Sequence, residues 1–588
     1  MYKMGKWDLS ELAKDHKSQK FAKQIASLQK KAVSFERLKS TLKPAMPSRD
    51  FFRIIRNIEQ IAEDASTVGG YASLLYAANT QSDEATSLLT KISKLGAEID
   101  NKMLFFDLWW KRGIDESNAQ RLIGDAGSLQ EYLRYKRLLA KYSLSEPEEK
   151  IINTLDVTGP TALVKLYDKI TNAFEYTVMV NGRKKKMTRE QLTTLVRSTN
   201  PRTREMAYKT LLSKYQQNKG VIGEIYQNLV LNWKDEGIEI RKHSSPISIR
   251  NVGNNVDDKT VDSLLKVCRD NASVFYDFFA YKAKSLGLKK LRRYDLYAPG
   301  LKKAKERNYS YEKAAGLVLD SLARFSPTLS EYAQRVFSEN HIDSEIRPGK
   351  RDGAFCSTIS PKITPYVLLN YTGKSRDVFT LAHELGHAVH SVAASKQSIL
   401  VSEAPLPLAE TASTFSELLL YDNISGQMSD DEKRLILSEK IDDLYATIMR
   451  QSFFTLFEMS AHKHIADGTT VEGISKAYSE NLKAQFANSV DLSDDFAVEW
   501  SCIPHFFHTP FYCYAYSFGN LLSLALYQRY KKEGAEFAKT YTEILAAGGS
   551  QKPEVLLGRY GIDIRAKQFW QDGFDYIRSQ VKELVSLN

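Results

Sequence analysis

The sequence predicts a mainly α-helical protein with a small β-sheet, and three observations support this fold class. Apolar residues recur every three to four positions in long stretches, among them 51–63, 261–287 and 433–465, which is the period of an amphipathic helix. Strand signals are few and are concentrated in 174–187 and 354–371. The chain has 588 residues, which is more than one hydrophobic core usually supports, so we expect at least two packed regions.

Helix starts can be placed at two points in the first half of the chain. Ser82 is followed by Asp83 and the segment EATSLLTKI, and Asn200 is followed by Pro201 and RTREMAYKTLLSKY. Small polar side chains cap helix N-termini, and proline suits the first helical turn. We therefore expect long helices that begin directly after each of these two positions.

A β-hairpin is expected over 174–187. Asn181-Gly182 joins the alternating segment YTVMV to the basic segment RKKKM, and an Asn-Gly pair favours the tight turn of a two-stranded hairpin. We place a division of the chain after this hairpin. Residues 1–195 then form an N-terminal helical region, and residues 196–588 form a second region.

Composition and charge exclude several classes of protein. Apolar residues make up 43% and charged residues 26% of the chain, as in ordinary globular proteins. No apolar run approaches the ~20 residues of a membrane span, and the polar start MYKMGKWDLSELAKDHKSQK lacks the apolar middle of a secretory signal. The net charge is +11, but basic and acidic residues are interleaved throughout. We expect a cytoplasmic protein without a nucleic-acid or membrane partner.

Cysteine usage argues against a disulfide scaffold and a thiolate metal site. The four cysteines, Cys268, Cys356, Cys502 and Cys513, are far apart and form no CxxC pair. Disulfide frameworks need more cysteines at closer spacing, and structural zinc knuckles need paired thiolates. We expect reduced thiols.

The segment 380–390, TLAHELGHAVH, carries the strongest chemical signal. His383 and His387 are four residues apart, and Glu384 follows the first histidine. Chance matches to HExxH in a chain of this composition number on the order of 0.01. The helix is apolar on most sides and is therefore expected to be buried. Because burying two imidazoles without partners is costly, a metal ion is a better explanation than core packing.

The spacing also predicts how these residues would act. Side chains at i and i+4 lie on one helix face, so both imidazoles can bind one Zn²⁺. Glu384 is turned to the side of that face, which suits a general base acting on water. Gly386 leaves room for a neighbouring helix to approach.

A third protein ligand is expected downstream, because catalytic zinc usually has three protein ligands and one open position. Glu403, Glu410 and Glu417 compete for this role. Glu403 precedes two prolines and is expected in a loop, whereas Glu410 lies in the first turn of the following helix. Glu410 and Glu417 are seven residues apart and share a helix face. One of the two could bind zinc while the other orients a histidine, and spacing favours Glu410 as the ligand.

At this point the sequence resembles the M3 family of zinc metallopeptidases, specifically the oligoendopeptidase F branch. The segments that carry the resemblance extend over nearly the whole chain. They are HELGHAVH with LAETASTFSELLL, Trp7-Asp8-Leu9, the hairpin 174–187, GKRDGAFC at 349–356, Pro504-His505-Phe506, Pro510-Phe511-Tyr512 and Ala547-Gly548-Gly549-Ser550.

The resemblance implies a gluzincin-type fold in which two helical regions flank a deep substrate channel, with 196–588 as the catalytic domain. It implies one Zn²⁺ per chain, held by His383, His387 and Glu410, and Glu384 as the catalytic carboxylate. It also implies a histidine and a tyrosine from the aromatic segment 504–518. These are matched to His505 and Tyr512, with Tyr514 and His508 next.

Two further features bear on substrate binding. Residues 353–371 read as an edge strand that could hold a peptide backbone by strand addition, with Gly353, Ala354 and Phe355 at its start. A purely structural strand is an equal alternative. His508 is a further candidate for contact with the substrate.

The sequence thus predicts a zinc-dependent endopeptidase that hydrolyses internal bonds of short, unstructured oligopeptides, using water activated by zinc and Glu384 as general base. Two alternatives stay open. One is a metallocarboxypeptidase of similar helical architecture, and the other is a basic helical binding protein with a structural metal site. The sequence predicts no particular oligomeric state.

Overall fold

The computed structural model describes residues 2–180, 183–299 and 307–587. By their internal contacts these residues form two compact units, each assembled from three stretches of chain. Unit 1 comprises Met1–Lys141, Glu306–Gln427 and Leu526–Asp563, and unit 2 comprises Tyr142–Lys305, Met428–Ala525 and Ile564–Asn588. The expected division at residue 195 stays a prediction.

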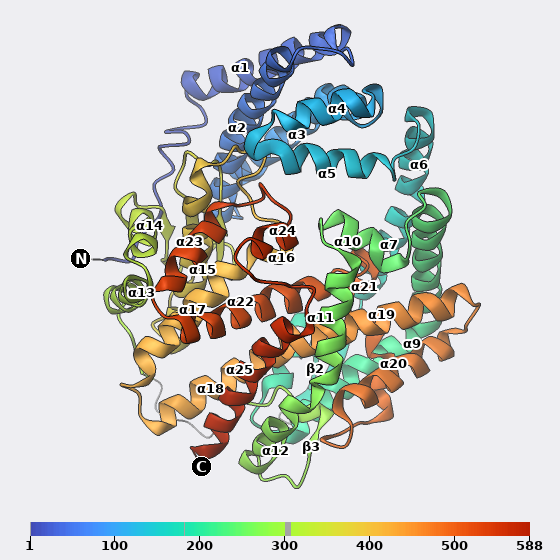
Figure 1. Cartoon of the computed structure of the whole chain (residues 1–588). Helices are drawn as coiled ribbons and strands as arrows, with labels where there is room; N and C mark the ends of the chain where they lie inside the picture. Colours follow the sequence, from blue (N-terminus) through green and yellow to red (C-terminus); the bar gives the residue numbers. More distant parts are fainter. Residues whose placement is uncertain (1, 181–182, 300–306, 588) are drawn as a thin grey trace. The chain divides into compact units, whose positions relative to one another are not determined.

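Unit 1 contains the HExxH segment and is mostly helical (Figure 1). Its helices are α1 (Gln19–Glu36), α2 (Ser48–Ala78), α3 (Asp83–Leu108), α4 (Glu116–Gly124), α5 (Gln130–Ala140), α13 (Tyr311–Phe325), α14 (Pro327–Ser338), α15 (Ser375–Ala393), α16 (Leu406–Ala409), α17 (Thr411–Ser425), α23 (Glu536–Ala546) and α24 (Pro553–Gly558). Its strands are β4 (Ile342–Asp343), β5 (Phe355–Ser357) and β6 (Tyr366–Leu368).

Unit 2 contains the aromatic segment 504–516 and is likewise mostly helical. Its helices are α6 (Glu146–Thr158), α7 (Pro160–Asn172), α8 (Arg189–Thr194), α9 (Pro201–Lys234), α10 (Pro246–Gly253), α11 (Asp258–Asp270), α12 (Tyr276–Ser285), α18 (Asp430–Leu444), α19 (Arg450–Ala466), α20 (Val471–Phe486), α21 (Pro504–His508) and α25 (Lys567–Ser586). Its strands are β1 (Tyr176–Val180), β2 (Arg183–Met187), β3 (Leu291–Arg292) and β7 (Val490–Asp491). Helix α22 (Tyr514–Glu533) runs from unit 2 into unit 1.

The mainly helical fold with little sheet is therefore confirmed, and both expected helix starts are as predicted. The Ser82 side chain accepts a hydrogen bond from the Ala85 N–H at the start of α3, and Asn200 accepts one from the Arg202 N–H at the start of α9. The periodic stretch 261–287 forms two helices, α11 and α12, with Asn271 at the end of the first.

Both expected strand regions contain strands, but 353–371 forms two short antiparallel strands, β5 and β6, rather than the single edge strand that was expected. Strands β1 and β2 pair antiparallel with Val180 opposite Arg183, and the predicted turn residues Asn181 and Gly182 lie outside the described residues. In unit 1, β6 is the middle strand of a three-stranded sheet, parallel to β4 and antiparallel to β5. Strand β5 is therefore an edge strand.

Candidate metal centre

Helix α15 carries HExxH through the interior of unit 1. Its start is capped by Asp377, whose carboxylate accepts hydrogen bonds from the backbone N–H groups of Thr372 and Lys374. Lys374 is the N-cap residue, with an extended backbone, and Ser375 is the first helical residue. The helix packs against α13, α14, α17, α23 and β5. Its apolar residues are buried as expected, which fixes the direction of the two histidine side chains.

Gly386 allows α17 to approach α15 closely. A Cβ atom at this position would lie 2.5 Å from the carbonyl oxygen of Ala412 and 2.6 Å from the Cα of Ser413. Real Cβ atoms do not come so close to backbone, so only glycine fits here without displacing α17. The close approach brings the start of α17 to the face of α15 that carries the histidines.

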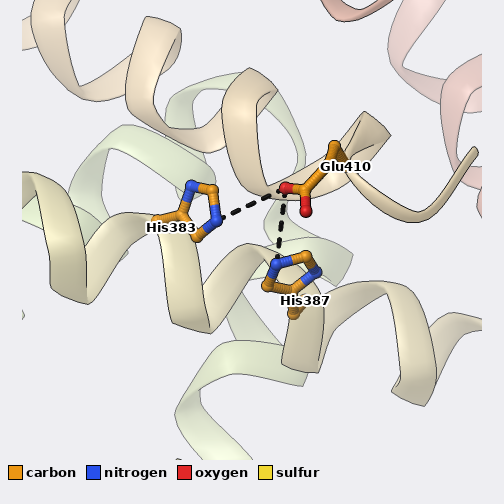
Figure 2. A group of neighbouring side chains, drawn as sticks. All are labelled: His383, His387 and Glu410. Atoms are coloured by element: carbon orange, nitrogen blue, oxygen red, sulfur yellow. Dashed lines mark ion pairs between the residues drawn. The ribbon is translucent and has the colours of Figure 1, made fainter. Parts of the chain in front are cut away.

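Three side chains converge at this contact (Figure 2). The Nε2 atoms of His383 and His387 lie 3.4 and 3.5 Å from the same oxygen, Oε2 of Glu410. Glu410 sits at the junction of α16 and α17, one residue before the first helical turn in which it was expected. Glu403 is exposed and lies outside this group.

These distances fit a tetrahedral metal site better than a direct ion pair. Charge-assisted N–H···O bonds are typically ~2.7–2.9 Å long. Two ligands bound tetrahedrally at about 2.1 Å from one ion are separated by about 3.4 Å, which matches both observed separations. The donor set therefore suits a divalent metal ion.

Glu417 contacts His383 on the side away from Glu410, where an acid could orient this histidine. The Nδ1 of His383 lies 2.6 Å from Oε1 of Glu417. With Nδ1–H donating to this carboxylate, Nε2 presents its lone pair toward Glu410. Sequence reasoning did not find a second supporting residue, Ser413, whose hydroxyl donates to Oε2 of Glu410 at 2.7 Å.

The electrostatics of the group favour a cation. Burial alone would lower the pKa of His383, but Glu410 and Glu417 outweigh it and raise that pKa well above its usual value. Burial likewise would raise the pKa of Glu410, yet hydrogen bonds and charges from His383, His387 and Ser413 lower it to about 2. The negative charges of Glu410 and Glu417, which favour the protonated form of His383, would also attract a metal ion to the position of that proton.

Glu384 is buried next to this group but does not belong to it. Burial raises the pKa of its carboxyl group to about 7, against which the charge of His383 and the nearby backbone N–H of Cys356 act only partly. Cys356 belongs to β5, the strand of the sheet that packs against α15. A carboxyl group with a pKa near neutrality is suited to exchange protons. Sequence reasoning did not predict the contact with Cys356.

The aromatic segment forms its own cluster within unit 2. The rings of His505 and Tyr512 stack with centroids 5.8 Å apart, and Tyr512 meets Tyr516 edge-on at 5.3 Å. The Tyr516 hydroxyl lies 3.4 Å from Nε2 of His505. Tyr514 is separate and fully buried, and its hydroxyl accepts a hydrogen bond from Asn254. The catalytic roles expected for His505, Tyr512 and Tyr514 stay predictions.

The remaining candidates occupy two places. Gly353, in a left-handed conformation with φ of 78°, and Ala354 lead into the edge strand that begins at Phe355. His508 is exposed in unit 2, where its Nε2 lies 2.8 Å from Asp168 Oδ1. Their contact with substrate stays a prediction.

A second group of possible ligands in unit 1 has a different character. Glu11, Glu339 and His341 also lie close together, with 3.5 Å between His341 Nε2 and Glu11 Oε2. Both carboxylates are exposed, and the Arg335 guanidinium lies 3.4 Å from Glu339. Exposed groups neutralised in this way are typical of a solvated ion-pair network.

A helical fold around an HExxH helix and a nearby glutamate defines the class as a metallopeptidase. The family model for peptidase family M3 matches residues 194–576, which is more than half of the chain. The chain belongs to peptidase family M3.

Individual relatives agree with this assignment. The chain is 27% identical to an oligoendopeptidase F homolog of Borreliella burgdorferi, over 99% of this chain and 98% of that protein. It is 27% identical to oligopeptidase PepF of Bacillus subtilis, over 83% of this chain and 72% of that protein. These relatives place the chain in the oligoendopeptidase F branch of the family.

Solved structures show the same fold. A crystal structure from Chlamydophila abortus, described as a peptidase, superposes with a TM-score of 0.87 at 23% identity and covers 99% of this chain and 98% of that one. Oligoendopeptidase F of Enterococcus faecium superposes with a TM-score of 0.70 at 20% identity, covering 97% and 99% of the two chains.

Proposed function

We propose that the protein is a zinc-dependent endopeptidase that cleaves internal bonds of short, unstructured oligopeptides. The observation that carries this proposal is the convergence of His383, His387 and Glu410 on one point, with Glu384 beside it. The relatives named oligoendopeptidase and oligopeptidase support peptides as substrates. The deep channel implied by the family resemblance stays a prediction, and so does a cytoplasmic location. Within the described residues, the structure contains no helix with the length and apolarity to span a membrane.

The residues present account for the chemistry that peptide hydrolysis requires. Zinc bound by His383, His387 and Glu410 would polarise the scissile carbonyl and lower the pKa of water. Glu384 takes a proton from the attacking water and delivers it to the leaving amine. Glu417 keeps His383 in the tautomer that presents Nε2. The family pattern assigns His505 and Tyr512 to donate hydrogen bonds to the oxyanion.

Internally quenched peptides of graded length test this proposal. Wild-type protein should cleave them, and o-phenanthroline should abolish cleavage, because the metal supplies part of the chemistry. The Glu384→Gln variant should retain one zinc per chain and lose about 10²- to 10⁴-fold in kcat. Asp377→Asn, at the start of the same helix, is the matched control and should keep most activity. Cleavage by the Glu384→Gln variant at nearly the wild-type rate would contradict the mechanism.

Peptides with blocked ends separate the alternatives. Cleavage inside a C-terminally amidated peptide excludes a carboxypeptidase, and mass spectrometry of the products shows where the bond was broken. A structural metal site would be closed by four protein ligands. The group found among the described residues contains three, which supports an open, catalytic position.

A further inference from the structure

A strained backbone turn lies inside the aromatic segment of unit 2. Phe511 has a φ of 57°, in the left-handed region that residues other than glycine rarely adopt. A bulky residue persists there only when its surroundings enforce the conformation. The turn lies directly before Tyr512 and after His508, between α21 and α22.

Two side chains from distant parts of unit 2 hold the peptide unit at this turn. The Nε of Arg250, in α10, donates to the carbonyl oxygen of Pro510 at 3.0 Å. The backbone N–H of Phe511 donates to Oε1 of Glu458, in α19, at 2.8 Å. The peptide between Pro510 and Phe511 is thus fixed at both of its polar ends.

Helix α19 also holds the Phe511 side chain. His462 lies one helical turn after Glu458, and its ring packs against the Phe511 ring with centroids 4.6 Å apart. Both side chains are buried, with 0% and 3% of their surface exposed for Glu458 and His462. Among the described residues, Oε2 of Glu458 and both ring nitrogens of His462 have no hydrogen-bond partner.

Packing alone does not explain an acid at this position. An ionised carboxylate in an apolar interior is costly, and the usual outcome is that the group keeps its proton. Burial raises the pKa of Glu458 to about 8, against which the Phe511 N–H and Arg250 act only partly. The group therefore remains a neutral acid near pH 7, with one oxygen that accepts the Phe511 N–H.

The turn determines where the next residue points. Tyr512 stacks on His505 and contacts Tyr516, whereas its neighbour Tyr514 faces Asn254. If Phe511 relaxed to an ordinary right-handed or extended conformation, the direction of the chain into Tyr512 would change, and the stack on His505 would be lost.

We infer that Glu458 is a positioning residue for the peptidase reaction: together with Arg250 it enforces the left-handed turn at Phe511 and so holds Tyr512 against His505. The inference rests on the proposed function, in which His505 and Tyr512 stabilise the oxyanion. It assigns a role to a buried acid that neither binds the metal nor touches the reacting atoms.

Substitution at Glu458 tests the inference by comparing a variant that removes the hydrogen-bond acceptor with one that keeps it. Glu458→Leu removes the acceptor and should lower kcat by about 10- to 100-fold with KM within about twofold, because the displaced donors act on the transition state. Glu458→Gln keeps an oxygen for the Phe511 N–H and resembles the neutral acid, so its kcat should stay within about threefold of wild type. Zinc content should remain one per chain in both variants.

Thr455 provides the matched control on the same helix. It is fully buried, and its hydroxyl donates to the Gln451 carbonyl within α19. Thr455→Val therefore changes a buried polar group of this helix without removing the acceptor of the turn. Its kcat should equal that of the wild type.

A double-mutant cycle with Tyr512→Phe distinguishes positioning from general damage to the core. If Glu458 acts through Tyr512, Glu458→Leu should cost no more than about twofold in a Tyr512→Phe background. A full loss of kcat in that background would overturn the inference. Equal losses of kcat in Glu458→Leu and Glu458→Gln would also overturn it, and so would a wild-type kcat in folded Glu458→Leu. A wild-type rate for Tyr512→Phe would overturn it as well.

Arg250→Met applies the same test if Glu458→Leu does not fold. It removes the second anchor of the turn and should show the same loss of kcat and the same coupling to Tyr512→Phe, and a wild-type kcat would overturn the inference. Cleavage by the wild-type protein that resists chelation would instead refute the proposed function. The two failures are therefore distinguishable.

Discussion

Replacing Gly386 with alanine tests whether the contact between α15 and α17 sets the metal geometry. The new Cβ would lie 2.5 Å from the Ala412 oxygen and 2.6 Å from the Ser413 Cα. Because both are backbone atoms, neither can rotate away. The helices must separate by about 1 Å to reach an ordinary contact distance, which for such an overpacked site costs about 1–3 kcal/mol.

This displacement acts directly on Glu410. Glu410 immediately precedes α17 and would move with Ser413. The separation between His387 Nε2 and Glu410 Oε2 is 3.5 Å, close to the tetrahedral value of about 3.4 Å. An increase of about 1 Å is far beyond the ~0.2 Å tolerance of metal–ligand distances. We expect the zinc affinity of Gly386→Ala to fall by at least about 100-fold.

Zinc affinity of Gly386→Ala can be measured by titration against a competing chelator, and metal content by mass spectrometry. Gly316 in α13 is the control, because nothing lies within 4 Å of a Cβ added there. Gly316→Ala should keep wild-type zinc affinity and gain about 0.5–1 kcal/mol of stability, since alanine favours helix. A Gly386→Ala protein with wild-type zinc affinity and wild-type kcat/KM would refute the reasoning.

Three further predictions concern Glu417 and Ser413 beside the histidines and Glu458 at the Phe511 turn. Glu417→Leu removes the acceptor of His383 Nδ1 and should weaken zinc binding by about 10- to 100-fold, with Glu417→Gln in between, when measured in zinc buffers. Ser413→Ala removes a hydrogen bond to ionised Glu410 and should weaken zinc binding by about 10-fold; an unchanged dissociation constant would contradict this. Burial raises the pKa of Glu458 from 4.5 to about 8. Between pH 4.5 and pH 8 the folded state therefore binds more protons than the unfolded state. The free energy of unfolding falls by about 1.4 kcal/mol per pH unit as the pH rises through this window. The stabilisation of Glu458→Gln relative to wild type, followed by denaturant midpoints, should therefore grow from pH 5 to pH 8, and a constant difference would be evidence against the prediction.

The convergence of His383, His387 and Glu410 could be predicted from sequence because its geometry is local. His383 and His387 are related by one helical turn, so the helix alone brings them together. Glu410 could be proposed because it opens the next helix of the segment, and Glu417 because it lies two turns further on the same face. The packing between helices could be predicted only in part. Gly386 indicated that another helix approaches α15, but it did not indicate which helix. The contact between Glu384 and the Cys356 backbone depends on a three-residue strand and has no sequence signal.

The contacts that hold Phe511 could not be predicted, because they join residues that are far apart in the sequence. Glu458 and Phe511 are 53 residues apart, and Arg250 and Pro510 are 260 residues apart. Nothing in the periodicity of either helix links them to the aromatic segment. The only available signal was an acid within the apolar stretch FFTLFEMSAHKHI, which marks an unusual buried group but not its partner. The two-residue strands β3, β4 and β7 were missed because tertiary pairing, rather than local propensity, creates them.

Three glutamates show how the surroundings of one side chain type assign different roles. Two imidazoles and a hydroxyl face Glu410, and they lower its pKa to about 2, so it is an ionised group ready to bind a cation. Glu384 lies near one backbone N–H, and burial raises its pKa to about 7, where a base can both take and return a proton. Glu458 also receives one backbone N–H, but its complete burial raises the pKa to about 8, and it serves as a neutral acceptor. The three roles therefore depend on the burial of each glutamate and on the hydrogen-bond donors around it, and not on the type of side chain. Variants that remove a donor, such as Ser413→Ala, are therefore as informative about this protein as variants that remove the acid itself.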